Sequence, residues 1–193
     1  VILCGLGKKD ELDAEKLRSA AAGATALARK MNIGKVSFTL FGAPVQDATS
    51  RLRAIFDGAV LGFYSFNEYK KEKGDSPERN KKIEEMEFLL PEIMEENEVA
   101  EERKKMDKYA TIAEAVYFAR NLANHPASVV TPRFLADTAE ALSKQYEGVA
   151  CAILDKNKMA ELGMNGVLAV GRGSDYEPMF IELVYKPAEA SDE

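Results

Sequence analysis

The chain has a single histidine, His125, so a catalytic triad or a histidine-dependent metal site would have to use this residue. Such sites need a base that a third group orients, and a histidine placed directly before Pro126 has no evident partner in the sequence. Only two cysteines are present, Cys4 and Cys151, and they lie far apart in apolar runs with no C-x-x-C spacing. We therefore expect a surface loop histidine and two reduced, buried thiols.

Two further absences limit the class of protein. No apolar run approaches the roughly 20 residues that cross a bilayer, and no signal-peptide pattern opens the chain. The net charge is -6, whereas binding to a phosphate backbone needs Lys and Arg in clustered excess. We expect a cytoplasmic protein without membrane contact and without a general nucleic-acid surface. Hydrophobic residues make up 46% of the 193 positions, which is enough for one folded domain or two small ones.

The first half of the sequence alternates between strand and helix patterns. The apolar run Val1–Leu6 predicts a buried strand, and Lys35–Phe41 and Glu87–Leu90 predict two more. Apolar residues recur at three- and four-residue steps over Leu17–Met31 and Leu52–Phe63, which predicts two helices that each bury one face. Strands alternating with helices predict an α/β domain with a largely parallel sheet and right-handed crossovers.

Two contrasting segments follow this domain pattern. Lys70–Lys82 is charged, contains Gly74 and Pro77, and is expected to be an exposed loop and a natural cleavage site. Glu95–Asn124 contains no proline or glycine, which predicts one helix about 45 Å long. Its sequence is charged at the start and apolar at the end, so we interpret it as a strut between domains.

The stretch from Asn121 to Ala136 contains residues that end one helix and start another, as expected at a domain junction. Pro126 disfavours helix at the residue before it, and Ser128–Val130 favours extended backbone. Thr131 can cap the amides of a new helix, and proline at the following position loses no hydrogen bond.

A second α/β pattern follows the junction. We expect a helix over Leu135–Tyr146, a strand over Val149–Leu154 and a short helix over Lys156–Leu162, which Gly163 ends. The runs Val167–Val170 and Met179–Tyr185 predict adjacent strands. About 70 residues form only a small core, so the remaining faces of this sheet should need covering.

Two glycine-rich turns each allow a structural and a binding interpretation. Gly5-Leu6-Gly7 could cradle a phosphate before a helix, but Asp10 stands where the third glycine of the dinucleotide motif would fall. A plain turn from strand to helix is the preferred interpretation. Gly171-Arg172-Gly173-Ser174 could offer Arg172 to an anion, yet a hairpin connection explains both glycines.

Charged and aromatic clusters are weighed in the same way. The acidic groups at Glu84-Glu85, Glu95–Glu98 and Glu101-Glu102 lack the spacing of a calcium loop, so we interpret them as solvated helix faces rather than a cation site. The cluster of Phe63, Tyr64, Phe66 and Tyr69 could stack bases or form a subunit contact. Packing of this cluster at the edge of the core, against the long helix, is preferred.

Seven residues of the junction fit one known pattern, in which a helix ending in Ala-Arg-x-Leu-x-Asn-x-Pro leads to Thr-Pro: Ala119, Arg120, Leu122, Asn124, Pro126, Thr131 and Pro132. The pattern resembles the interdomain junction of the leucyl aminopeptidase family, the M17 metallopeptidases. Residues 1–21, 58–73 and 162–187 are similar to further landmarks of this family, in the family's order.

The resemblance implies a macro-like N-terminal α/β domain at residues 1–94, truncated at its start, a linker helix at 95–124, and the incomplete beginning of the peptidase domain at 125–193. It implies a parent enzyme that is a homo-oligomer, a hexamer, and removes N-terminal residues from peptides. The parent would use two divalent ions, zinc or manganese.

In the family the metal ligands follow the strand that resembles Phe180–Tyr185, on a Gly-Lys-Gly turn and an Asn-Thr-Asp-Ala-Glu-Gly-Arg stretch, and neither string occurs here. We therefore expect a scaffold and assembly part that is inactive alone, and assign no catalytic, cofactor-binding or metal residue to it. The alternatives are a nucleotide or ADP-ribose module of the macro-domain type, and a second role in DNA binding.

Overall fold

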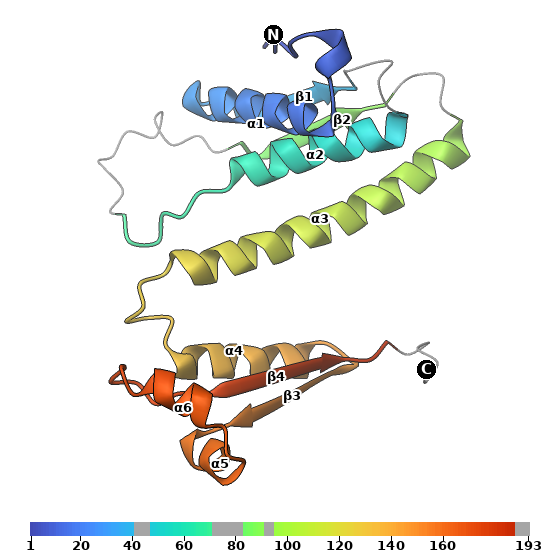
Figure 1. Cartoon of the computed structure of the whole chain (residues 1–193). Coiled ribbons are helices and arrows are strands. Elements are labelled where there is room, and N and C mark those ends of the chain that lie inside the picture. The colour runs from blue at the N-terminus through green and yellow to red at the C-terminus, as the bar shows by residue number, and fades with distance from the viewer. Residues whose placement is uncertain (41–46, 71–82, 91–94, 188–193) are drawn as a thin grey trace. The chain divides into compact units, whose positions relative to one another are not determined.

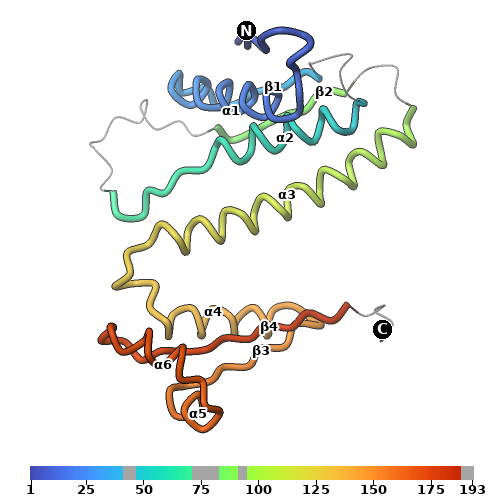
Figure 2. The backbone as a smooth tube through the Cα atoms, viewed as in Figure 1, coloured from blue at the N-terminus to red at the C-terminus, as the bar shows by residue number. Residues whose placement is uncertain are grey.

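The structure is a computed structural model that describes residues 1–40, 47–70, 83–90 and 95–187. The chain divides into two compact units, Val1–Asn121 and Leu122–Glu193, whose elements are labelled in Figure 1 and can be followed along the backbone in Figure 2. No helix in the described part of the chain is long and apolar enough to cross a membrane. Each unit is described by itself.

The first unit is built on a parallel pair of strands, β1 (Lys35–Thr39) and β2 (Glu85–Leu89). One face of the pair carries Phe38 and Phe88, whose rings stack with centroids 5.5 Å apart. Helices α1 (Ala14–Lys30) and α2 (Ala48–Phe63) cover this apolar face. The two expected helices, the strands expected at Lys35–Phe41 and Glu87–Leu90, and their parallel pairing are thus confirmed for the described residues. The strand expected at Lys35–Phe41 ends at Phe41, which lies outside the described residues.

The opposite face of the sheet is polar. Lys35 Nζ lies 2.5 Å from a Glu87 oxygen and 3.0 Å from a Glu85 oxygen, and Ser37 donates a 2.6 Å hydrogen bond to Glu87. These contacts raise the pKa of Lys35 above its ordinary value, and the hydrogen bond with Glu87 has the largest effect. The contacts with Lys35 and Ser37 lower the pKa of Glu87.

Helices α1 and α2 pack closely because glycines of α2 meet the backbone of α1. A Cβ atom added at Gly58 would lie 2.7 Å from Arg18 Cα, and one added at Gly62 would lie 2.8 Å from Ala22 Cβ. Both helices begin at an aspartate cap: Asp13 accepts from the Lys16 amide and Asp47 from the Ser50 amide. Hydrogen bonds from Ser50 lower the pKa of Asp47.

The long helix α3 (Glu96–Asn124) runs parallel to α2 and contacts it through long side chains. Arg53 lies over the Tyr109 ring, 4.2 Å from its centroid. Near the end of α2, Tyr117 donates to the carbonyl of Val60 and Arg120 donates to that of Leu61 at 3.0 Å. Two carbonyls of the last turn of α2 therefore accept from side chains of α3, and that of Phe63 accepts from Arg29 of α1 at 3.2 Å.

Three expectations for the first unit are wrong. Val1–Leu6 forms no strand, and Leu3 is 91% exposed, because the segment pairs with neither β1 nor β2. Cys4 lies in this segment and is consequently an exposed free thiol rather than a buried one. Glu102 is not on a solvated helix face, because it is 5% exposed and accepts a 2.6 Å hydrogen bond from Thr49. The expected loop at 71–82 lies outside the described residues.

The second unit contains the antiparallel strands β3 (Val149–Leu154) and β4 (Phe180–Tyr185), with α4 (Pro132–Gln145) packed against both. Two short helices, α5 (Lys156–Glu161) and α6 (Asn165–Gly171), connect the strands. The expected helix at α4, the strand at β3 and the short helix at α5 are confirmed. Cys151 is half-buried on β3 and is a free thiol.

The region of Val167–Val170 is helical, so the predicted strand there is wrong. A run of four apolar residues does not distinguish a strand from one turn of helix, and here the run lies within α6. Strand β4 pairs with β3 instead. The hairpin expected at Gly171–Ser174 is also wrong, because these residues connect a helix to a strand.

Candidate functional site

The interdomain junction is a tight turn rather than an extended run. The amides of Val129 and Val130 both donate to the Pro126 carbonyl, at 2.9 and 3.0 Å, which corrects the expectation of extended backbone at Ser128–Val130. The Thr131 hydroxyl accepts from the Phe134 amide at 3.2 Å, so the predicted cap of α4 is confirmed. His125 lies half-buried in the bend that precedes this turn.

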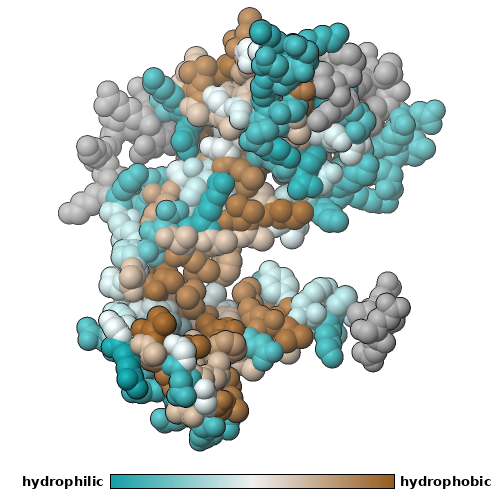
Figure 3. Space-filling view, in the orientation of Figure 1, coloured by the Kyte–Doolittle hydropathy of each residue, from teal (hydrophilic) through white to brown (hydrophobic). Residues whose placement is uncertain are grey.

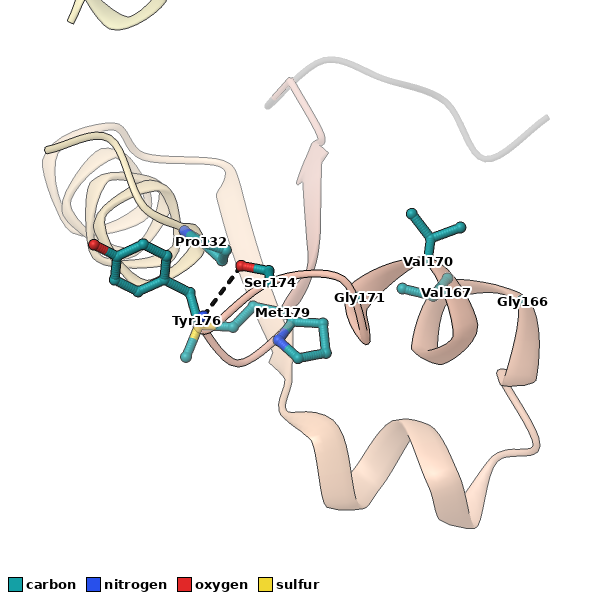
Figure 4. A pocket seen from close by; sticks show the side chains of 9 residues that line it. Pro132, Gly166, Val167, Val170, Gly171, Ser174, Tyr176 and Met179 are labelled. Carbon is teal, nitrogen blue, oxygen red and sulfur yellow. Dashed lines mark hydrogen bonds between the residues drawn. The ribbon is translucent and has the colours of Figure 1, made fainter. Parts of the chain in front are cut away.

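An apolar groove opens beside α6 and the loop that leads to β4 in the second unit. It has a volume of about 490 Å³. Its walls are Pro132, Gly166, Val167, Val170, Gly171, Ser174, Tyr176, Pro178 and Met179 (Figure 4). The Ser174 hydroxyl accepts a 3.1 Å hydrogen bond from the Tyr176 amide, which fixes the turn at the rim. A Cβ atom at Gly171 would lie 2.8 Å from the Pro178 ring, so only glycine fits there.

The groove is suited to holding apolar groups rather than to catalysis. Among the described residues that line it, the polar side chains are those of Ser174 and Tyr176, and none is a histidine, a carboxylate or an amine that could activate a nucleophile. Sequence reasoning missed the groove because Val167 and Val170 were assigned to a strand. Gly163 follows the end of α5 with a positive φ of 69°, and α6 begins two residues later at Asn165.

The described residues were also searched for a metal centre of the kind the resemblance implies. Among residues 1–40, 47–70, 83–90 and 95–187, no group of three or more His, Cys, Asp or Glu side chains is arranged to hold a metal ion. The described donor set therefore does not fit a two-metal site, and we derive no catalytic step through metal ions from it.

The glycine turn at the start of the chain lacks the geometry of a phosphate site. Gly7 has a positive φ of 78°, and a three-residue 3₁₀ helix (η1, Lys9–Glu11) follows it rather than an α-helix. Helix α1 begins only at Ala14, seven residues after Gly7, and the Asp13 carboxylate already accepts from the Lys16 amide at 2.8 Å. A carboxylate thus occupies the place where a phosphate would bind.

A second, polar pocket lies at the start of α2 in the first unit. It has a volume of about 570 Å³ and is lined by Ala48, Thr49, Asn97, Glu98, Glu101, Glu102 and Lys105. Lys105 Nζ lies 2.7 Å from Glu102 Oε1, and this hydrogen bond is the main cause that raises the pKa of Lys105. Sequence reasoning missed this pocket because it placed Glu102 in solvent.

Arg120, near the end of the long helix, contacts both the end of α2 and the aromatic residue that follows it. Arg120 caps α2 and also lies over the Tyr64 ring, 5.3 Å from its centroid. The Tyr64 and Tyr117 rings contact each other with centroids 5.2 Å apart, and burial raises the pKa of Tyr117. The preferred packing of Tyr64 against the long helix is confirmed.

Comparison with known proteins gives two matches to one family. The model described as the cytosol aminopeptidase family, N-terminal domain, matches residues 1–73, and the one described as its catalytic domain matches residues 117–193. The probable cytosol aminopeptidase of Geotalea uraniireducens is 36% identical over 186 residues, which are 96% of this chain and 36% of that protein. That of Aquifex aeolicus is 36% identical over 190 residues, which are 97% of this chain and 35% of that protein.

Two solved structures are similar in fold to this chain. The bottromycin maturation enzyme BotP in complex with Mn has a TM-score of 0.76 and 30% identity, and the match covers 96% of this chain and 36% of that one. The cytosol aminopeptidase from Coxiella burnetii has a TM-score of 0.63 at 21% identity, covering 92% of this chain and 33% of that one, which shows a shared fold. This chain spans about a third of the length of the relatives it matches.

Proposed function

Because the chain belongs to the cytosol aminopeptidase family, we propose that it is the N-terminal region of an enzyme that removes N-terminal residues from peptides. In this proposal residues 1–94 form the N-terminal domain, 95–124 the linker helix and 125–193 the beginning of the catalytic domain. The observation that carries the proposal is the match of both family domains, in order, to the two ends of the chain.

We assign the chemistry of the whole enzyme to residues outside this chain. The related structure of BotP was determined with Mn, which supports a divalent metal, manganese or zinc, as the cofactor of the whole enzyme. The described part of this chain offers no fitting donor set. Its proposed part is therefore to position the catalytic domain and to support assembly, with a hexamer and a cytoplasmic location as further parts of the proposal.

The exposed face of the β3–β4 sheet supports this role. Helix α4 packs on the strands, and Cys151 and Ile153 are half-buried, whereas Ala150 and Ala152 on the opposite face are exposed. Phe180 is 38% exposed and Val184 39% exposed on that same face. Figure 3 shows apolar side chains at the surface of the second unit. Glu182 lies between Phe180 and Val184 on the same face and is also exposed. Exposed apolar side chains of this kind gain from a cover, and we propose that further parts of the catalytic domain provide it.

The direct test is an activity assay on the purified 193-residue chain with a leucyl chromogenic substrate and added Mn²⁺ or Zn²⁺. We expect no turnover above that of the buffer with metal alone. Turnover that copurifies with the chain and is abolished by a chelator would contradict the assignment of the chemistry to other residues. An active homologous aminopeptidase, assayed in parallel, confirms that substrate and metal are competent.

A further inference from the structure

The one Asn-Gly dipeptide of the chain, Asn165-Gly166, places a side-chain amide next to an unhindered backbone amide. Both residues are exposed and lie at the start of α6. No described residue forms a hydrogen bond or ion pair with the Asn165 side chain. A Cβ atom at Gly166 would meet no other part of the chain within 4 Å, so the space beside its backbone is open. Glycine also lets the backbone turn more freely than any other residue.

The backbone amide of Gly166 has no acceptor that would restrain it. It belongs to the first turn of α6, whose amides have no partner within the helix. Met164, which precedes the helix, provides no side-chain cap, and no described carbonyl outside the helix accepts from Gly166. Seven residues without a cap form a marginal helix. Opening of the first turn, which brings the Gly166 nitrogen towards the Asn165 side chain, therefore costs little free energy.

Asn157 shows the opposite arrangement in the neighbouring helix α5. This residue is also exposed, and its helix has only six residues. The backbone amide that follows it, that of Lys158, donates to the Asp155 carboxylate at 2.8 Å. This cap engages the amide and stabilises the first turn of α5. The two exposed asparagines therefore differ in the freedom of the amide that follows each of them.

We propose that Asn165 is a site of spontaneous deamidation in the folded chain. The Gly166 nitrogen attacks Cγ of Asn165 and forms a new C–N bond, which closes a five-membered imide ring. The bond from Cγ to the side-chain nitrogen breaks, and this nitrogen leaves as ammonia with the proton of the Gly166 amide. Water then opens the ring at either carbonyl, which gives aspartate or isoaspartate. Water is the single co-reactant.

The two products act differently on the apolar groove, whose wall includes Gly166, Val167 and Val170. Aspartate keeps the length of the main chain and adds a negative charge to the first turn of α6, where the helix dipole favours it. Isoaspartate adds one carbon atom to the main chain before Gly166, so the helical spacing is lost and Val167 moves relative to Met179 (Figure 4). Deamidation thus changes the shape of the groove as the protein ages.

The test follows the full 193-residue chain in mildly alkaline buffer by ¹⁵N-edited NMR, with circular dichroism to show that it stays folded. We expect the side-chain amide signals of Asn165 to disappear while those of Asn157 persist. The backbone signals of Val167 and Val170 should shift as isoaspartate accumulates, which enzymatic methyl transfer to its carboxyl group measures. The same chain in urea gives the rate for the unfolded state. The folded chain should react within about tenfold of that rate, a barrier difference of about 1.4 kcal/mol.

The matched variant is Gly166→Ala, because the added Cβ hinders attack by the amide and meets no other part of the fold. We expect this variant to deamidate at least about tenfold more slowly than the wild type. The comparison of Asn165 with Asn157 needs no variant. Persistence of the Asn165 signals, protection of the folded chain by more than about tenfold relative to urea, an unchanged rate in Gly166→Ala, or equal loss of Asn157 would each overturn the proposal.

Discussion

The close contact between α1 and α2 makes Gly58→Ala the most informative substitution in the first unit. The added Cβ would lie 2.7 Å from Arg18 Cα and closer still to the Arg18 carbonyl oxygen. An ordinary contact between such atoms is about 3.5 Å, so the helices would have to separate by about 1 Å. The group that must move is backbone, which does not turn away as a side chain would.

The expected cost follows from what this separation disturbs. Ile55 and Ala59 of α2 pack with Ala21 of α1 and with Phe38 of the sheet, and these four residues form a buried hydrophobic cluster of the unit. Overpacking of a core costs about 1 to 3 kcal/mol and occasionally more. Alanine recovers up to about 1 kcal/mol of helix propensity. Because the clash is with backbone, the cost lies at the upper end of this range, and after the propensity gain we expect Gly58→Ala to lower the free energy of unfolding of this unit by about 2 kcal/mol.

The matched control is Gly23→Ala on α1. A Cβ atom at Gly23 would meet no atom within 4 Å, so only the propensity gain remains, and we expect stabilisation of about 0.5 to 1 kcal/mol. The chain has two units, so the assay is native-state hydrogen exchange at the α2 amides, which reports the opening of the first unit alone. Equal or greater protection in Gly58→Ala than in the wild type would refute the close contact.

Three further predictions concern single side chains. Thr25 is fully buried and its hydroxyl has no partner, so Thr25→Val should stabilise the first unit by about 1 kcal/mol; a lower melting temperature would mean that the hydroxyl is in fact bonded. The contacts of Glu87 lower its pKa in the folded chain, so they stabilise the fold at pH values above the pKa of Glu87 in the unfolded chain. This stabilisation is lost as the pH falls through the lower pKa of the folded chain. Glu87→Gln should thus be less stable than the wild type in urea at pH 7, with the difference shrinking as pH falls through the lowered pKa of Glu87; a difference that persists in strong acid would exclude the pair with Lys35 as its cause. Thr131→Ala should cost about 1 kcal/mol of α4 stability, measured as faster amide exchange at Phe134; unchanged exchange would contradict the cap.

The elements that sequence patterns predicted well are those whose signals are local. Leu17–Met31 and Leu52–Phe63 repeat at the helical period over several turns, and α1 and α2 formed there. Glu95–Asn124 has no helix breaker, and α3 ends at Asn124 as expected. The cap at Thr131 depends on residues three positions apart, which a sequence displays directly.

Two of the wrong predictions required knowledge of a partner, and a third rested on too short a run. An apolar run such as Val1–Leu6 becomes a strand only where a sheet edge accepts it, and the run alone does not show that edge. The burial of Glu102 depends on Thr49, a residue more than fifty positions away in the chain. The four residues of Val167–Val170 are too few for periodicity to decide between helix and strand. The groove and the polar pocket were missed for these reasons.

The central claim, that this chain is the N-terminal region and the start of the catalytic domain of an aminopeptidase, is tested most directly by a chimera. In it residues 1–193 replace the matching segment of the Aquifex aeolicus relative, whose sequence is 36% identical there. A folded chimera should hydrolyse a leucyl substrate when Mn²⁺ or Zn²⁺ is added, and the relative's remaining segment alone should not. A chimera with a native circular dichroism spectrum and oligomeric state, but no metal-dependent turnover under conditions where the relative is active, would contradict the claim.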